Sequence, residues 1–271
     1  MVKTAAEALA EFEGARRWFS AARLRGWLIG CAILAFYAVA AQLVHFDLAK
    51  LAAGVPKLWH WLSQAWPLKY QELPLFLWRT AETVAMAAIG TTIATVIAVP
   101  FAILASRNVT PFPRFYYPTR WLLNALRGID SFVFALLFVA AVGLGPFAGV
   151  LGIAFHTTGT VAKFFADQIE SANLGPYESI RATGTRRLSA LAFGLLPDLQ
   201  PLLFSTALFW WEFNIRASTV LGVVGAGGIG QELKNSMDLL DFSRLFTIIA
   251  VILCVVAVLD WFSGWLRKKL V

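Results

Sequence analysis

The chain has 271 residues, of which 59% are hydrophobic and only 14% are charged. A soluble domain carries about 25% charged residues, so this composition excludes an ordinary soluble globular protein and predicts an all-α membrane protein. The formal net charge of +7 is compatible with nucleic-acid binding, but the positions of the basic residues explain it in another way, given below.

Six apolar stretches predict transmembrane helices, each of which needs about 20 mostly apolar residues. Residues 1–25 are too charged for a signal peptide and predict a cytoplasmic amphipathic helix before the first span. The expected spans are residues 27–44, 75–105, 121–142, 150–165, 197–221 and 245–265. Residues 48–74 mix tryptophans with polar side chains, which is typical of a segment in the membrane interface. Residues 1–74 and 75–271 are therefore expected to form two parts of the chain.

The distribution of Lys and Arg predicts the orientation of these spans. If the N-terminus is cytoplasmic, most of the 23 basic residues fall in cytoplasmic segments. The outer segments then hold only Lys50, Lys57, Lys69 and Lys234. Cytoplasmic loops are enriched in Lys and Arg, so both termini are expected inside the cell, and membrane topology rather than nucleic acid accounts for the positive charge.

A stripe of small residues recurs every fourth position in the second span, at Gly90, Ala94, Ala98 and Ala102. Small residues allow helices in lipid to approach closely. The stripe predicts either simple packing within the chain or a specific subunit interface.

A polar loop between the fourth and fifth spans contains a short predicted helix of about 8 residues. Pro176 suits the first helical turn, and Glu178 lies where a carboxylate meets the positive end of the helix dipole. Gly184 is a natural terminator. By itself this pattern is compatible with a capped surface helix that has no partner.

The spacing of Glu178, Gly184 and the pair Leu196-Pro197 resembles the coupling loop of ABC importer permeases, with Ser179 and Ile180 replacing two alanines and Gly194 replacing an isoleucine. In that family the short helix docks into a cleft of a separate ATPase. The resemblance implies that the loop at 172–197 does the same. Its coupling residues would be Glu178, Ser179, Ile180, Arg181, Gly184, Leu196 and Pro197.

Three further stretches look like the phosphonate branch of these permeases: "ETVAMAAIGTTIATVIAVPFAILASRNV", "LLNALRGIDSFVFALLFVAAVGLGPFAGVLGIAFHT" and "RASTVLGVVGAGGIGQEL". The likeness covers residues 75–265 and departs at Asp130, where a proline is expected. It implies a type I ABC importer permease fold with a methionine-permease-like core, which moves phosphonate or a related phosphorus oxyanion (phosphate or phosphite) by alternating access.

The same resemblance implies the assembly and its location. The expected partners are a second copy of the chain, two cytoplasmic ATPase subunits and an extracytoplasmic phosphonate-binding protein, in the lipid of a bacterial cytoplasmic membrane. No cofactor and no nucleic acid are expected on this chain, because ATP and Mg²⁺ would be bound by the ATPase. Phosphate-loop and metal-protease motifs are missing from the sequence, so the chain is not expected to be an enzyme.

The stretch "VVGAGGIGQEL" has the G-x-G-x-x-G spacing of a dinucleotide-binding loop. Such a loop follows a strand, whereas this one leaves the outer end of the fifth span, so a nucleotide site is excluded. Gly225, Gly227, Gly228 and Gly230 are expected to form irregular backbone at the outer mouth of the pathway. Two interpretations stay open, a substrate-contacting gate and a structural re-entrant turn.

Four charged residues inside the expected spans are candidates for the translocation pathway, since such residues usually face a pathway or one another. They are Arg127, Asp130, Glu212 and Arg216, and Asp260 in the sixth span is a further ionisable group of this kind. Structural pairing of Arg127 with Asp130, or of Glu212 with Arg216, is the alternative, and His156 is expected to be a packed histidine. Two other functions stay open: a permease for methionine or glycine betaine, and an ATP-independent secondary transporter.

Overall fold

The computed structural model describes residues 21–270 of the chain, and within that range its regular structure is entirely helical. Most of the predicted cytoplasmic helix at 1–25 lies outside the described residues. The chain divides into two compact units, residues 1–60 and residues 61–271.

The first unit contains α2, Ala21–Leu43, and most of α3, Leu48–Ser63. Residues 25–43 of α2 are apolar enough and long enough to cross a membrane. At the start of α3, the Asp47 carboxylate accepts hydrogen bonds from the backbone N–H groups of Ala49 and Lys50, at 2.9 and 3.2 Å. The acidic side chain thereby caps the N-terminus of this helix.

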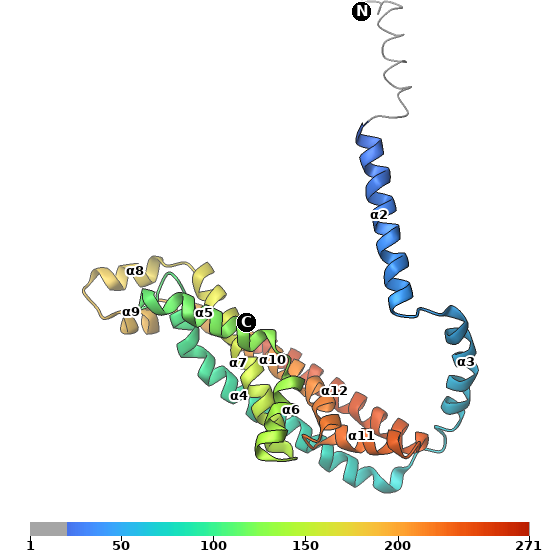
Figure 1. The fold of residues 1–271 in the computed structure, drawn as a ribbon. Coiled ribbons are helices and arrows are strands. Elements are labelled where there is room, and N and C mark those ends of the chain that lie inside the picture. The colour runs from blue at the N-terminus through green and yellow to red at the C-terminus, as the bar shows by residue number, and fades with distance from the viewer. Residues whose placement is uncertain (1–20, 271) are drawn as a thin grey trace, which may run out of the picture. The chain divides into compact units, whose positions relative to one another are not determined.

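The second unit is a helical bundle (Figure 1). In chain order its elements are η1 Tyr70–Glu72, α4 Leu73–Ala105, α5 Pro113–Gly128, α6 Ser131–Val142, α7 Pro146–Ser171, α8 Gly175–Ala182, α9 Arg187–Gly194, α10 Leu196–Leu221, η2 Gly222–Val224, α11 Ile229–Asp238 and α12 Phe242–Leu270. The central helix is α7, which packs against α4, α5, α6 and α10.

The small-residue stripe of α4 packs inside the chain. Ala94 and Ala98 are fully buried, and Ala102 is 1% exposed. A Cβ added to Gly90 would lie 2.8 Å from Cγ2 of Ile153 on α7, closer than any ordinary contact. The stripe therefore brings α4 against α7, in agreement with the packing interpretation.

The described residues include three helices that can each span a membrane, in residues 25–43, 70–105 and 242–269. Two bent helix pairs bring the number to five if each pair is one span. The span predicted at 121–142 corresponds to the C-terminal part of α5 together with α6, two helices that meet at 86°. The central α7 is not among these helices; it lies largely buried among the others, so contact with lipid does not require it to be strongly apolar. The count of six spans stays a prediction.

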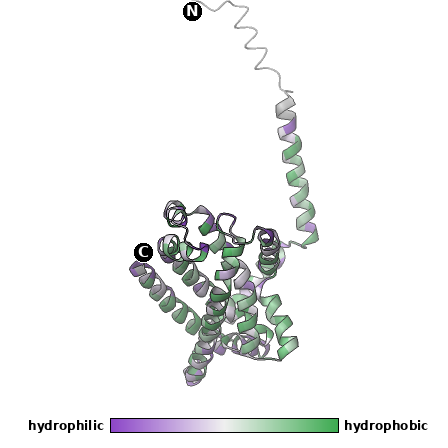
Figure 2. Cartoon of the chain, turned by 90° about the vertical axis from the view of Figure 1, so that its left-hand side faces the viewer, coloured by the Kyte–Doolittle hydropathy of each residue, from purple (hydrophilic) through white to green (hydrophobic). Residues whose placement is uncertain are grey.

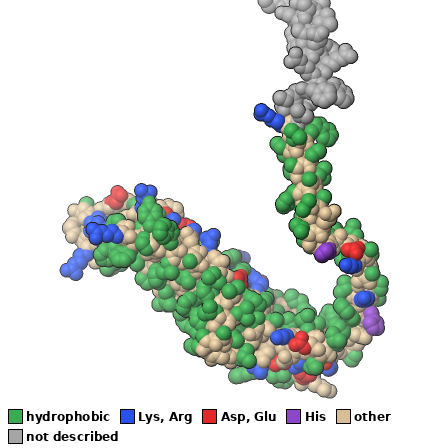
Figure 3. Space-filling view, viewed as in Figure 1, with side chains coloured by type: hydrophobic (Ala, Val, Ile, Leu, Met, Phe, Trp, Pro, Cys, Tyr) green, Lys and Arg blue, Asp and Glu red, His purple; other side chains and the backbone are tan. Residues whose placement is uncertain are grey.

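Opposite ends of the second unit have different surfaces. Figure 1 shows α8 and α9 at one end and α11 at the other. Hydrophobic residues dominate the helices between these ends (Figure 2). Figure 3 shows Lys and Arg side chains with some acidic ones at the α8 end, and a close mixture of acidic and basic side chains at the α11 end.

The mixed charges at the α11 end form a network that joins α4, α11, α12 and the short helix η1. Arg244 of α12 donates to Glu232 of α11 at 2.7 Å and to Glu72 of η1 at 2.8 Å. Arg79 of α4 lies 3.5 Å from the same Glu232 and 2.9 Å from Glu82. These ion pairs hold α11 between the N-terminal ends of α4 and α12.

Candidate coupling and translocation sites

The predicted coupling helix is present as α8, Gly175–Ala182, with 8 residues. Pro176 occupies its first turn, where a missing N–H costs nothing, and Glu178 places a carboxylate in the same turn. Ser179 donates to the carbonyl of Gly175 at 2.9 Å. Gly184 has a φ of +83° just beyond the helix, a conformation that other residues adopt only at a cost. The predicted start and stop of this helix are confirmed.

One face of α8 is buried and the other is open. Tyr177 is 8% exposed and packs into the core of the second unit. Ile180 and Arg181 are half-buried, and an Nη of Arg181 donates to the Thr185 carbonyl at 3.1 Å. Glu178 and Ser179 are exposed, so they lie on the face that is free to meet a partner.

A second short helix, α9, supports α8 and was missed by the sequence analysis. A Cβ on Gly194 would lie 2.9 Å from the Cα of Tyr177 and 3.1 Å from the carbonyl oxygen of Pro176. This contact explains the glycine where the resembling loops have isoleucine: the backbones of α8 and α9 touch there. Leu196 and Pro197 then begin α10, both exposed.

The third predicted span breaks at Ile129 and Asp130, between α5 and α6. Asp130 caps α6 by accepting a hydrogen bond from the backbone N–H of Phe132 at 2.8 Å. The Ile129 carbonyl lies 2.8 Å from Nδ1 of His156 on α7. Asp130 is thus the N-cap of α6 at the position where a proline was expected. His156 binds the Ile129 carbonyl at the break, which agrees with the prediction of a packed histidine.

Arg127 lies at the C-terminal end of α5, where its charge suits the helix dipole. Its side chain is exposed, and within residues 21–270 no ion pair joins it to Asp130. The alternative of a structural Arg127–Asp130 pair is therefore absent from this structure. Its role in the pathway stays a prediction.

Glu212 and Arg216 belong to a four-membered charge cluster between α10 and α12. Arg216 lies 3.5 Å from Glu212, one helical turn away, and 3.3 Å from Asp260 of α12. Arg267 of α12 donates to Glu212 at 2.5 Å. The predicted pairing within α10 is present, and both side chains also bind the neighbouring helix. This arrangement favours a structural role for the two residues, and their part in the pathway stays a prediction.

The glycine loop forms irregular backbone at Gly225, Gly227 and Gly228, as predicted, but the prediction is wrong for Gly230, which lies in the first turn of α11. Gly225, Gly227 and Gly228 have φ values of +88°, +78° and +70°. A Cβ on Gly230 would lie only 1.9 Å from the Thr219 carbonyl oxygen, so α11 crosses α10 at backbone contact. The short helix η2 precedes the loop. A dinucleotide-binding loop follows a β-strand instead, so this loop does not have the structure of such a site.

Two hydrogen bonds fix the glycine loop to the bundle. Gly145 N–H, before α7, donates to the Gly225 carbonyl at 2.9 Å, and Ile229 N–H donates to the Thr83 hydroxyl of α4 at 2.9 Å. Ala226, inside the loop, is fully buried. The loop is thus a packed connection between three helices. Whether it also gates substrate stays open.

A buried polar group in the centre of the bundle was missed by the sequence analysis. Asn214 of α10 is fully buried, and its amide nitrogen donates to the hydroxyls of Thr91 on α4, at 2.8 Å, and Thr157 on α7, at 3.0 Å. Its amide oxygen has no hydrogen-bond partner. The signal was available, since an asparagine in an apolar span is expected to bond across helices.

Comparison with known proteins finds relatives along most of this chain. The putative phosphite transport system permease protein HtxC of Stutzerimonas stutzeri is 45% identical over 247 residues, which cover 91% of this chain and 88% of HtxC. The phosphite transport system permease protein PtxC of the same organism is 39% identical over 222 residues, 82% of this chain and 81% of PtxC. The phosphate-import permease protein PhnE of Mycolicibacterium smegmatis is 39% identical over 191 residues, 70% of this chain and 36% of PhnE.

Solved structures agree with the predicted fold. An inward-facing structure of the MetNI methionine ABC transporter matches with a TM-score of 0.65 at 19% identity, over 75% of this chain and 100% of the solved chain. At that identity the likeness concerns the fold, which is that of the predicted methionine-permease-like core. Residues 76–271 match the family described as the binding-protein-dependent transport system inner membrane component. The chain therefore belongs to that family: it is an inner-membrane permease component of an ABC importer, a family whose members work with an ATPase and a binding protein.

Proposed function

We propose that this permease moves a phosphorus oxyanion, namely phosphite, phosphonate or phosphate, into the cell. The observation that carries the proposal is the likeness to HtxC, 45% identity along 91% of the chain. PtxC and PhnE, whose names also state phosphite or phosphate transport, match more than two thirds of this chain. All three names describe the same chemical class, a tetrahedral phosphorus oxyanion.

The chain supplies the pathway and not the chemistry of hydrolysis. ATP and Mg²⁺ would bind to two ATPase subunits, each facing one copy of the permease in a homodimer. The open face of α8, with Glu178 and Ser179, is the surface that would enter the cleft of an ATPase subunit. Closure of the ATPase dimer would then move α8, and the pathway would open outward to accept substrate from the binding protein.

Movement of α8 would reach the membrane helices through a continuous apolar core. Tyr177 of α8 and Leu191 of α9 belong to the same buried cluster as Phe165 of α7, Ala102 of α4 and Leu199 of α10. Protein interiors are close-packed and transmit displacement. This core supports a coupling loop that moves together with three of the long helices.

Arg127 is the residue that we propose to meet the passing oxyanion. Its guanidinium is exposed and makes no ion pair with Asp130, and a guanidinium matches the oxygens of phosphorus oxyanions well. Arg216, by contrast, is held between Glu212 and Asp260. Of the predicted pathway residues, Arg127 therefore retains the most freedom to bind an anion.

The proposal is tested with the complete transporter in proteoliposomes. The cognate binding protein is loaded in turn with phosphite, phosphate, methylphosphonate, methionine or glycine betaine, and uptake and ATP hydrolysis are measured. We expect stimulation by at least one phosphorus oxyanion and by neither amino-acid-derived solute. Uptake of methionine or glycine betaine instead would refute the substrate class, and uptake without ATP would refute the importer mechanism.

A further inference from the structure

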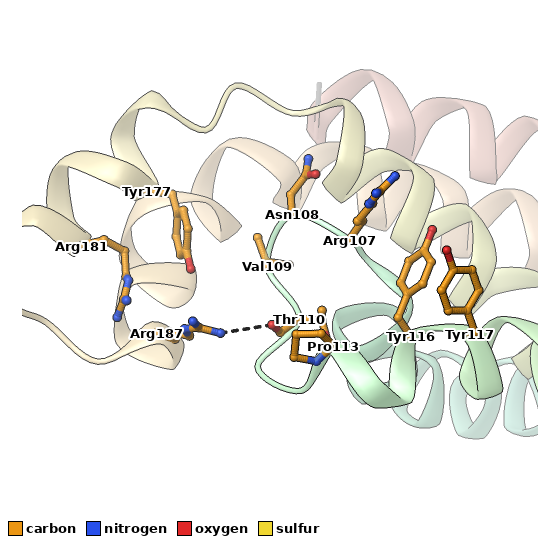
Figure 4. Close-up of a pocket in the computed structure, with 10 residues that line it drawn as sticks. All are labelled: Arg107, Asn108, Val109, Thr110, Pro113, Tyr116, Tyr117, Tyr177, Arg181 and Arg187. Atoms are coloured by element: carbon orange, nitrogen blue, oxygen red, sulfur yellow. Dashed lines mark hydrogen bonds between the residues drawn. The ribbon is translucent and has the colours of Figure 1, made fainter.

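A cavity of about 420 Å³ lies behind the coupling helix, on the side of α8 away from its open face. Its walls come from α8, α9, the turn between α4 and α5, and the N-terminal end of α5. Six of the lining side chains carry its chemistry: Arg107, Arg181, Arg187, Tyr116, Tyr117 and Tyr177. Figure 4 shows Arg181, Arg187 and Tyr177 on one side and Arg107, Tyr116 and Tyr117 on the other.

No ion pair among the described residues neutralises the charge of this arginine cavity. None of its lining residues is acidic, and within residues 21–270 its three arginines form no ion pair. The nearby carboxylates are engaged elsewhere: Glu170 accepts from the Arg107 backbone N–H at 2.7 Å and lies 2.9 Å from Arg120. Three arginines thus line one hollow, and no acidic residue lines it with them.

Most of the hydrogen-bond donors of these arginines are free to bind a ligand. Arg187 donates to the Thr110 carbonyl at 3.3 Å and Arg181 to the Thr185 carbonyl at 3.1 Å, each through a single nitrogen. These bonds hold the two side chains in place, and each guanidinium keeps further N–H groups. The side chain of Arg107 makes no hydrogen bond within the described residues.

Membrane topology alone does not explain this arrangement. The enrichment of basic residues in cytoplasmic loops depends on their number and not on where in a loop they lie. Arg114 and Arg186, for example, contribute to it without lining the cavity. Three like charges along one cavity repel one another unless an anion compensates them. Guanidinium groups with tyrosine hydroxyls beside them supply N–H and O–H donors around an anion with several oxygens.

We propose that the arginine cavity binds a phosphate-type oxyanion, and that the occupant bridges the coupling helices to the turn at 106–112. The phosphate group has two sources at this place, a free phosphorus oxyanion in the cytosol or the headgroup of an anionic phospholipid. Basic pockets between helices on the cytoplasmic side suit such headgroups. The inference rests on the cavity itself and is independent of which solute is transported.

The test measures binding to the complete transporter, ATPase subunits included, in two arms. In the first arm, inorganic phosphate is titrated calorimetrically into complexes in phosphatidylcholine nanodiscs. In the second, native mass spectrometry compares the number of phosphatidylglycerol molecules that stay bound to the complex with the number of phosphatidylcholine molecules. Saturable binding in the first arm identifies a free oxyanion as the occupant, and selective retention in the second identifies a lipid headgroup.

Matched variants decide whether the cavity is the site. The double variant Arg107→Gln/Arg187→Gln should bind the ligand of the positive arm at least about tenfold more weakly. Arg114→Gln/Arg186→Gln removes the same charge from the same surface outside the cavity and should bind as the unmodified protein does. Arg107→Lys/Arg187→Lys should recover part of the affinity, because lysine keeps the charge without the planar fork.

Two results would overturn the proposal. One is the lack of binding in both arms by the unmodified complex, including the case in which an ATPase side chain already fills the cavity. The other is an equal loss of affinity in the two glutamine double variants, which would indicate a diffuse effect of charge. If the double variant does not assemble, Arg107→Gln alone decides, since its side chain makes no hydrogen bond to lose.

Discussion

Gly194 offers the sharpest test of the coupling loop, because α8 and α9 touch there through backbone atoms. In Gly194→Ala the new Cβ would lie 2.9 Å from the Tyr177 Cα, whereas ordinary contacts begin at 3.4 Å. The carbonyl oxygen of Pro176, at 3.1 Å, cannot rotate aside as a side chain could. The backbone of α8 must therefore move by about 0.5 Å, and overpacking of this kind costs about 1–3 kcal/mol.

The displaced element is the helix that would meet the ATPase, so the expected defect lies in coupling and not in assembly. We expect the Gly194→Ala complex to form in the membrane and to hydrolyse ATP, but to move several-fold less solute per ATP. Uptake and ADP formation are measured in the same proteoliposomes, with loaded binding protein present. ADP is measured because an assay of released phosphate could not distinguish the product of ATP hydrolysis from a phosphorus-containing substrate.

Gly184 is the matched control, because its backbone conformation favours glycine there, whereas at Gly194 the lack of space does. A Cβ there would meet nothing within 4 Å, but its φ is +83°. Asparagine tolerates this conformation better than valine, so Gly184→Asn should couple nearly normally and Gly184→Val should not. At Gly194 the larger asparagine should be worse than alanine. Normal solute uptake per ATP in Gly194→Ala, or equal damage by both Gly184 variants, would refute the reasoning.

Three further predictions concern topology, the pathway and acid stability. A cysteine at Lys234 should react with a membrane-impermeant reagent from outside and one at Arg186 should not; the reverse pattern contradicts the orientation. Arg127→Gln should assemble and slow uptake without changing solute binding by the binding protein; unchanged uptake removes Arg127 from the pathway. The hydrogen bond from Lys69 lowers the pKa of Asp241 below its ordinary value of 3.8. The ionised Asp241 therefore stabilises the folded protein fully above pH 3.8, and this stabilisation is lost as the pH falls through the lower pKa of the folded state. The melting-temperature difference between Asp241→Asn and the unmodified protein should shrink over that range, and a constant difference contradicts this assignment.

Local signals in the sequence predicted the coupling helix closely. Pro176, Glu178 and Gly184 each act within one turn of their own position, as a first-turn residue, a dipole partner and a left-handed stop. Such effects depend on the backbone of neighbouring residues, so they can be read without a fold. The irregular glycine loop followed in the same way from the preference of glycine for positive φ.

Features that depend on partners distant in the sequence could not be predicted. The break after Ile129 interrupts an apolar stretch that is long enough to span a membrane, and its exposed carbonyl is bound by His156 from the next helix. The closeness of α8 and α9 at Gly194, and the convergence of three arginines from separate segments, likewise appear only when the chain is folded. Asn214 differs, because its polarity in an apolar span was a readable signal.

The structure also connects the coupling loop to the glycine loop through the long helix α4. Helix α4 runs unbroken for 33 residues, about 50 Å at 1.5 Å per residue. Near one end its Ala102 and Ala105 lie in the core shared with α8 and α9, and toward the other Thr83 accepts the hydrogen bond from Ile229 beside the glycine loop. One continuous helix, with Pro100 in its interior, therefore joins the core under the coupling loop to the glycine loop. The break between α5 and α6 lies beside this rod, where one acidic cap and one histidine bond hold an 86° bend. The exposed Arg127 therefore lies beside a bend that two local hydrogen bonds hold in place.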